Sequence, residues 1–220
     1  MNPESDYLNF LHSNEKKFYD DKHMVVVTFY KFFEVNDTLD FQVLLKSIFY
    51  KTKIKGTILI ASEGINGTIS GRKNEISKVL KQLWAINDLT DLKPKYSFSL
   101  KNPFFRMKIR LKKEIVTLGV SNVSPTKVVG NYIKPENWNE FILDDNVLLI
   151  DIRNNYEISI GSFKRALNPK IKNFREFPEW VSKNLLKKDP KIKNKKVAMF
   201  CTGGIRCEKY SNFFIFNFRI

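Results

Sequence analysis

The chain has 220 residues, and its 43% hydrophobic and 14% aromatic content is enough to fill the cores of two small domains, which excludes disorder on a large scale. The formal net charge of +15 predicts attraction to a polyanion, usually nucleic acid, although only eight of the 38 basic residues are Arg and a bias toward Lys would give the same charge. Two Cys cannot supply a four-ligand zinc site, and the polar segment 1–17 shows neither a signal peptide nor a membrane span. We therefore expect a cytoplasmic protein without a metal or a membrane partner.

The first half of the chain alternates between strand and helix patterns. Residues 1–22 are predicted to be an N-terminal extension, and 23–118 a first domain. β-Branched and aromatic runs predict strands at 24–30, 56–62, 65–70 and 95–100. Two helices, the first capped by Asp37, repeat apolar residues at i, i+3, i+4, i+7 and i+8. These residues are Phe41, Leu44, Leu45, Ile48 and Phe49, then Ile76, Val79, Leu80, Leu83 and Trp84. The order strand, helix, strand, strand, helix, strand is typical of ferredoxin-like domains.

A basic stripe follows in residues 103–113, where cations alternate with apolar residues. The cations are Arg106, Lys108, Arg110 and Lys112. On a strand they would share one face at a spacing of roughly 6.6 Å. Such a face either contacts the phosphates of RNA or is a solvated edge strand that carries lysines against aggregation. The absence of acidic residues between Lys101 and Lys113 favours RNA.

The second half is predicted to begin with a connector at 119–146 and to continue as a second domain at 147–220. The apolar run 147–150 leads into Asp151 and Arg153, which would leave the carboxyl end of a buried strand. Two interpretations of this pair stay open: the side chains orient the reactive loop or its substrate, or they form an ion pair that fixes their own loop. A helix is predicted near 178–188, before a lysine-rich turn at 187–196 whose role as an RNA contact also stays open.

The segment 197–209 carries the most specific signal. Four apolar residues run into Cys201, which would place this Cys at the mouth of a site at the end of a strand. Gly203 and Gly204 allow positive φ angles, so that backbone N–H groups can turn toward the sulfur. With Arg206 and the start of a helix, they would favour the thiolate and make Cys201 a nucleophile, the alternative being a buried structural Cys on a glycine turn.

The loop from Cys201 to Arg206 has one residue fewer between Cys and Arg than the C-x5-R loop of cysteine phosphatases, and it resembles the six-residue active loop of rhodaneses. The series Asp151, Arg153, Glu157, Gly161 and 166–169 is also similar to a rhodanese signature. The longer string 201–209 resembles one subfamily, the rhodanese-domain tRNA uridine hydroxylases, as do 28–31, 63–67 and 106–108. The resemblance extends over about residues 24–210 and then stops, as if the chain were truncated within the rhodanese domain.

This resemblance implies an α/β protein, in which an α+β ferredoxin-like domain precedes a rhodanese-like parallel α/β domain that is incomplete at its C-terminus. It implies an oxidoreductase that hydroxylates the wobble uridine of tRNA to 5-hydroxyuridine with molecular oxygen as co-substrate. Cys201 and Arg206 would be catalytic. The residues that would support the loop are Thr202, Gly203, Gly204, Ile205, Cys207, Asp151 and Arg153. No flavin, haem or iron motif is visible, so the sequence identifies no cofactor.

Two alternatives to hydroxylation stay open, namely a sulfurtransferase that carries a persulfide on Cys201 and an inactive, truncated RNA-binding remnant. Cys207 is expected to be a resolving or a supporting thiol. The apolar segment 213–220 is expected to continue the helix from Cys207, and to lie either against the exposed sheet or against a second copy of the chain.

Overall fold

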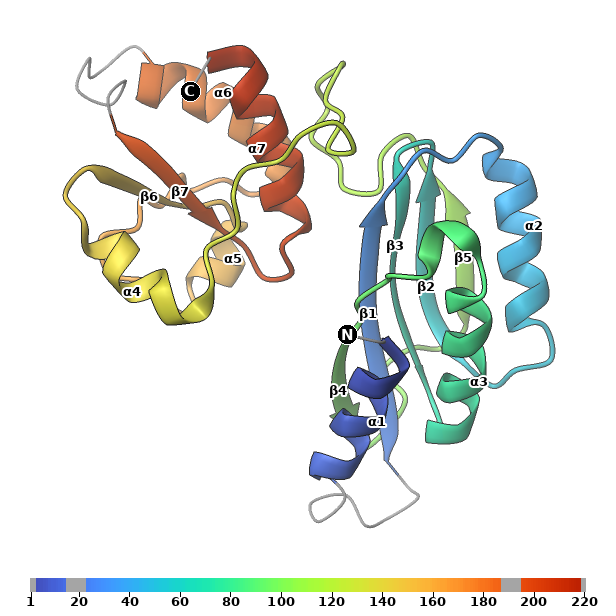
Figure 1. Ribbon diagram of the computed structural model, residues 1–220. Helices are drawn as coiled ribbons and strands as arrows, with labels where there is room; N and C mark the ends of the chain where they lie inside the picture. The colour runs from blue at the N-terminus through green and yellow to red at the C-terminus, as the bar shows by residue number, and fades with distance from the viewer. Residues whose placement is uncertain (1–2, 15–22, 187–194, 219–220) are drawn as a thin grey trace. The chain divides into compact units, whose positions relative to one another are not determined.

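The structure, a computed structural model, describes residues 3–14, 23–186 and 195–218 (Figure 1). It divides into two compact units, Met1–Ile115 and Val116–Ile220. The division falls three residues before the expected end of the first domain at 118. Most of the lysine-rich turn 187–196 lies outside the described residues.

The elements of the first unit are α1 (Pro3–Asn14), β1 (Met24–Phe32), α2 (Thr38–Phe49), β2 (Lys55–Ala61), β3 (Gly64–Gly71), α3 (Lys73–Trp84), β4 (Lys95–Ser99) and β5 (Met107–Leu111). Those of the second unit are α4 (Pro135–Leu143), β6 (Val147–Asp151), α5 (Asn155–Ile158), α6 (Phe177–Val181), β7 (Lys196–Phe200) and α7 (Ile205–Phe218). Short 3-10 turns occur at Asn87–Leu89 and Phe174–Glu176, and a π turn at Ser182–Leu186 follows α6.

The sheet of the first unit has the strand order β4-β1-β3-β2-β5. The first four strands pair antiparallel in the order 4-1-3-2 and connect as β-α-β-β-α-β, which confirms the ferredoxin-like prediction. The fifth strand, β5, pairs parallel with β2 and adds one edge to this arrangement.

One face of this sheet carries the core of the unit. Val27 and Phe29 of β1 and Ile58 of β2 are buried on that face together with residues from all three helices (Figure 1). The helix α1 belongs to this core, because Tyr7 and Leu11 are buried in it. The predicted N-terminal extension therefore contains a helix that is packed onto the first unit.

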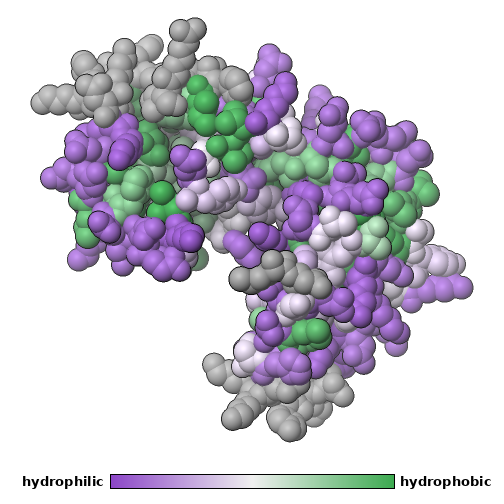
Figure 2. All heavy atoms as spheres, in the orientation of Figure 1, coloured by the Kyte–Doolittle hydropathy of each residue, from purple (hydrophilic) through white to green (hydrophobic). Residues whose placement is uncertain are grey.

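Helix α2 begins where the sequence predicts, because the side chain of Asp37 accepts hydrogen bonds from the backbone N–H groups of Leu39 and Asp40, at 2.8 and 2.9 Å. Its buried stripe is narrower than expected. Leu45 is buried, but Leu44 is 43% exposed because it lies about 100° round the helix from Leu45. Leu39, Val43 and Leu44 leave hydrophobic side chains on the surface of α2, and Figure 2 shows such side chains where Figure 1 places this helix.

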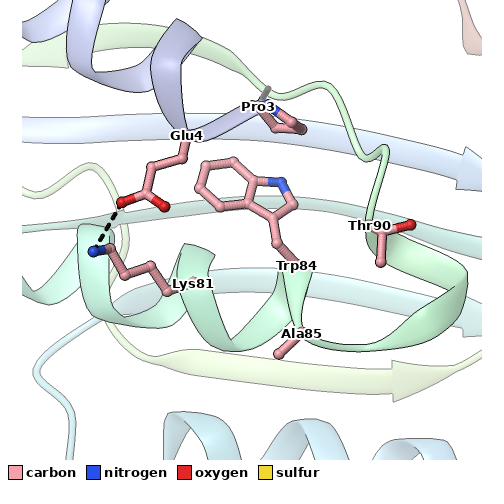
Figure 3. A pocket seen from close by; sticks show the side chains of 6 residues that line it. All are labelled: Pro3, Glu4, Lys81, Trp84, Ala85 and Thr90. Carbon is pink, nitrogen blue, oxygen red and sulfur yellow. Dashed lines mark ion pairs between the residues drawn. The ribbon is translucent and has the colours of Figure 1, made fainter. Parts of the chain in front are cut away.

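A surface hollow of about 390 Å³ lies between the start of α1 and the end of α3 (Figure 3). Glu4 and Lys81 form an ion pair of 2.8 Å across it, beside the indole of Trp84. Both charged side chains are partly exposed, so this pair contributes little to stability. The hollow marks where α1 docks onto α3.

In the second unit, β6 and β7 form a parallel pair, which a single parallel bridge from Ile150 to Leu167 extends. Helix α7 covers this pair, since Tyr210, Phe213 and Phe214 are buried in one cluster with Ile150. Phe213 and Phe214 therefore pack against the sheet of their own chain, which is the first of the two arrangements expected for the segment 213–220.

The residues that were expected to be a connector, 119–146, are packed into the second unit. Helix α4 contributes the buried Ile142 to a small cluster with β6 and β7. The buried side chain of Asn212 in α7 donates to the carbonyls of Ser124 and Val128 and accepts from the N–H of Ser124, at 2.8 to 2.9 Å. Buried polar groups need such partners, and this one fixes the preceding segment to α7.

None of the helices in the described ranges is long and apolar enough to cross a lipid bilayer.

The Asp37 cap gives a first testable prediction. Asp37→Ala should destabilise α2 by about 1 kcal/mol, because two backbone N–H groups lose their acceptor. Hydrogen exchange of the α2 amides measures this loss. Asp37→Asn is the matched control, because its amide oxygen still caps the helix, and equal exchange rates in both variants would contradict the assignment.

Candidate active site

The candidate active site lies where β6 and β7 end. Cys201 directly follows β7, and Asp151 is the last residue of β6, in register with Phe200. The N–H of Ile152 donates to the carbonyl of Phe200 at 3.1 Å, so the two chains leave the sheet side by side. Helix α7 begins four residues after Cys201. The parallel pairing therefore places Cys201 at the carboxyl edge of the sheet, as the sequence predicts.

Cys201 lies in a setting that stabilises its thiolate. The Cys207 side chain, which donates a hydrogen bond to the sulfur, is the main cause that lowers the pKa of Cys201 to about 5, and burial of the sulfur opposes it. The N–H groups of Cys207 and Gly204 add to this effect, the latter at 3.0 Å from Sγ, and the charge of Arg206 contributes less. At neutral pH Cys201 is therefore ionised, which is what a nucleophile requires.

The neighbouring Cys207 has the opposite tendency. Its hydrogen bond to Cys201 and its burial both raise its pKa, because a second negative charge beside the Cys201 thiolate is unfavourable. Both cysteines are unpaired thiols that contact the apolar cluster of the second unit. Cys201 is thus a thiolate, and Cys207 in the first turn of α7 is a protonated thiol.

The two glycines of the loop differ in conformation. Gly204 has a φ of +98°, which turns its N–H toward the sulfur of Cys201, as expected. Gly203 is not among the glycines with positive φ, and a Cβ at its position would meet no atom within 4 Å. The expectation of positive φ at both positions is therefore wrong for Gly203, since one left-handed residue suffices to close the loop.

Arg206 is held by a carboxylate on the other loop. Its two terminal guanidinium nitrogens donate to the two oxygens of Glu157, at 2.6 Å each. Thr202 Oγ1 also donates to Glu157, at 2.5 Å. The hydrogen bond from Arg206 is the main cause that lowers the pKa of Glu157 to about 2, and Thr202 adds to it, while burial opposes both. Bidentate pairs of this kind fix the guanidinium plane as well as its charge.

Asp151 and Arg153 form an ion pair within the loop that follows β6. Arg153 Nη2 and Nε lie 2.7 and 2.9 Å from the oxygens of the fully buried Asp151. The guanidinium also donates to the carbonyl of Gly161 at 2.6 Å, and Ser162 Oγ donates to Asp151 at 2.8 Å. Of the two open interpretations, this geometry favours the pair that fixes its own loop.

Glu157 connects the two loops, because it binds Arg206 and Thr202 while its backbone carbonyl accepts from Arg153 Nη1 at 3.4 Å. Glu157 belongs to the series that resembles a rhodanese signature, but the sequence pattern alone does not place its side chain in the site. A signal is present, since the Asn154-x-x-Glu157 spacing is that of a capping box, and the N–H of Asn154 donates to Glu157 at 3.1 Å.

The described residues contain no group of three or more His, Cys, Asp or Glu side chains placed to hold a metal ion.

The basic stripe lies in the first unit, on the edge strand β5. The strand is shorter than expected, because Asn102 Oδ1 accepts from the N–H of Phe104 and the preceding residues form a loop. The ladder nevertheless continues past both strand ends, since the N–H of Gly56 donates to the carbonyl of Arg106 and the N–H of Lys112 donates to Ile60. Arg106, Lys108, Arg110 and Lys112 therefore alternate along one extended segment, as predicted.

Alkylation provides a test of the thiolate. The labelling rate of Cys201 by iodoacetamide should rise through a midpoint near pH 5 and stay constant through pH 7, whereas Cys207 should react slowly, because its pKa is raised. Cys207→Ala should shift the midpoint of Cys201 to higher pH, because the main donor is lost. Peptide mass spectrometry locates the label, and faster labelling of Cys207 at neutral pH would contradict this account.

Comparisons with known proteins identify sequences that are similar to this chain. Residues 24–115 match the family described as the UPF0176 acylphosphatase-like domain. A tRNA uridine(34) hydroxylase of Acaryochloris marina is 50% identical over 186 residues, which are 84% of this chain, and the chain spans 58% of that protein. An acylphosphatase of Coxiella burnetii has 10% sequence identity to this chain and a TM-score of 0.30, and the match covers 40% of this chain and 93% of that protein. Over the aligned 186 residues, the chain is thus similar in sequence to this tRNA uridine(34) hydroxylase.

Proposed function

We propose that this protein hydroxylates the wobble uridine of tRNA to 5-hydroxyuridine in the cytoplasm, with molecular oxygen as co-substrate and Cys201 as nucleophile. The observation that carries the proposal is the ionised Cys201 at the end of β7, in a chain that is 50% identical to a tRNA uridine(34) hydroxylase. The thiolate supplies the nucleophile, and the relative's name supplies the substrate.

The first chemical step uses the thiolate. Cys201 Sγ bonds to C6 of a uridine that has left the base stack, and the electron pair of the C5=C6 bond moves to C5 and the neighbouring carbonyl oxygen. C5 is then nucleophilic and bonds to one atom of O2. Arg206 lies beside the thiolate, fixed by Glu157, so that its positive charge faces the site where the anion forms.

The second oxygen atom must take up two electrons and two protons, and the two thiols of the loop can supply them. Cys207, which is protonated, receives this oxygen atom as the O–O bond breaks. Loss of the C5 proton and cleavage of the Sγ–C6 bond restore the double bond. Cys201 then closes a disulfide with Cys207 and the oxygen leaves as water, so that uridine, O2 and two thiols yield 5-hydroxyuridine, a disulfide and water. An external thiol reductant reopens the disulfide.

We further propose that the basic stripe of β5 contacts tRNA phosphates. Arg106, Arg110 and Lys112 are exposed and Lys108 is half-buried, on a strand without a carboxylate. Phosphate contacts of this kind position an RNA without reading its sequence.

A mass measurement tests the hydroxylation. The purified chain, incubated with unmodified tRNA, oxygen and a thiol reductant, should add one oxygen atom to the wobble uridine, and isotopically labelled O2 should provide that atom. Cys201→Ser should abolish the product, because a hydroxyl is not ionised at neutral pH. Anaerobic incubation is the control. Unchanged tRNA, together with a persulfide on Cys201 after treatment with a sulfur donor, would instead support the sulfurtransferase.

The stripe has its own test. Replacement of Arg106, Lys108, Arg110 and Lys112 by Ala should weaken tRNA binding and flatten its salt dependence, by about 0.7 to 0.9 in the slope of log K against log salt for each lost phosphate contact. Filter binding at several salt concentrations measures this slope. A variant that binds tRNA with the wild-type slope would show that the stripe is only solvated surface.

A further inference from the structure

A row of polar side chains runs straight across the sheet of the first unit, on the face opposite the helices. The strand register pairs Lys95 with Thr28, Thr28 with Thr68, Thr68 with Thr57 and Thr57 with Lys108. Side chains of directly opposed residues point to the same face, so these five residues form one line. With strands about 4.8 Å apart, the line spans about 19 Å. It places three hydroxyls between two lysines, and Thr28 Oγ1 lies 3.0 Å from Thr68 Oγ1.

The neighbouring segments leave this polar row accessible within the unit. Asn102 in the loop before β5 donates to the carbonyl of Ser70, and the side chain of Asn66 donates to the carbonyl of Ile115 in the segment after β5. Ser70 and Asn66 lie two residues to either side of Thr68 along β3. The polar row therefore lies between the loop before β5 and the segment after β5. Thr28 and Lys95 are exposed, and Thr57, Thr68 and Lys108 are half-buried.

Within the five strands, the charge on this face has one sign, whereas the carboxylate of Glu63, just before β3, accepts from the N–H of Ile115 in the segment after β5. The five strands contain no Asp or Glu, whereas Lys55, Lys95, Lys108 and Arg110 stand on the face of the polar row. The basic stripe of β5 is thus one border of a wider cationic surface that extends over the sheet to β4.

An exposed aromatic side chain lies in the loop that leads from β4 past the end of β3 to β5. Phe105 is 99% exposed, and it lies in the loop that Asn102 ties to β3, directly before Arg106. A Phe left entirely in water gains nothing for the fold. Next to the exposed cation Arg106, such a ring has the properties of a stacking platform for an unpaired base.

We infer that this sheet face is a binding surface for single-stranded RNA, in which the polar row contacts the sugar–phosphate backbone and Phe105 stacks on one unpaired base. This inference rests on the proposed function and specifies where a tRNA loop would lie on the first unit. Cations and hydroxyls suit phosphates and 2′-hydroxyls, and the exposed ring distinguishes RNA from anions that have no base.

The stacking contact is tested by tRNA binding. Phe105→Ala should raise the Kd for tRNA about tenfold, because base stacking on an aromatic ring contributes about 1–3 kcal/mol. Phe105→Trp keeps an aromatic ring and should bind tRNA as tightly as the wild type. Tyr50→Ala is the matched control, since Tyr50 is a 71% exposed aromatic residue at the end of α2. An equal Kd for Phe105→Ala and Tyr50→Ala would overturn the stacking role.

The backbone contacts are tested with a double variant outside the stripe. Lys55→Gln with Lys95→Gln should lower the slope of log K against log salt by about 1.4 to 1.8, because two phosphate contacts are lost. The control, Lys46→Gln with Lys78→Gln, removes the same charge from exposed positions on α2 and α3 and should keep the wild-type slope. Equal slopes in both double variants would overturn the inference.

A cross-linking experiment does not depend on the variants. RNA that contains 4-thiouridine in the anticodon loop should cross-link to peptides that include Phe105 or β1, and exclusive cross-links to α2 or α3 would contradict the inference. A membrane is the alternative partner, and vesicles of phosphatidylserine test it. If the Phe105→Ala and Lys55/Lys95 variants bind these vesicles more weakly than the wild type but bind tRNA equally well, the surface binds a membrane instead. The binding of tRNA is measured separately from the formation of 5-hydroxyuridine. If the protein binds tRNA through Phe105 but forms no 5-hydroxyuridine, only the proposed function is rejected.

Discussion

The proposed chemistry depends on a negative charge held on one sulfur atom. Burial alone would keep Cys201 protonated, yet the Cys207 thiol and the backbone N–H groups of Cys207 and Gly204 outweigh that cost. These donors converge because a parallel strand ends at Cys201, one left-handed glycine turns the chain, and α7 begins at once. The geometry of the loop therefore determines its reactivity, and a change that moves the helix start would weaken the thiolate even with both cysteines present.

Glu157 extends this dependence to the rest of the second unit. It fixes Arg206 and Thr202 from the loop after β6, whose own shape is set by the ion pair between Asp151 and Arg153. The Glu157 carboxylate thus orients Arg206, and the positive charge of Arg206 interacts with both this carboxylate and the Cys201 thiolate. The result is a rigid cationic group beside the thiolate, which suits a reaction that builds negative charge on a pyrimidine ring.

Periodicity in the sequence predicted most of the local structure, and long-range pairing accounts for the rest. The cap at Asp37, the ferredoxin-like order and the position of Cys201 follow from patterns within a few residues. The pairing of Arg206 with Glu157 joins residues 49 positions apart, and no local pattern encodes such a contact. The same holds for Cys207 as the main donor to Cys201, and for the polar row on the sheet, which requires the register of five strands.

In the proposed reaction, the Cys201 thiolate attacks C6 of the wobble uridine. This step is tested most directly by trapping the adduct on an anticodon stem–loop RNA with 5-fluorouridine at the wobble position, since fluorine at C5 blocks loss of the proton that releases the enzyme. We expect a covalent protein–RNA species whose mass places the RNA on Cys201, and we expect that Cys201→Ser does not form it. An adduct on Cys207, or tight binding of this RNA with no covalent species, would contradict this step.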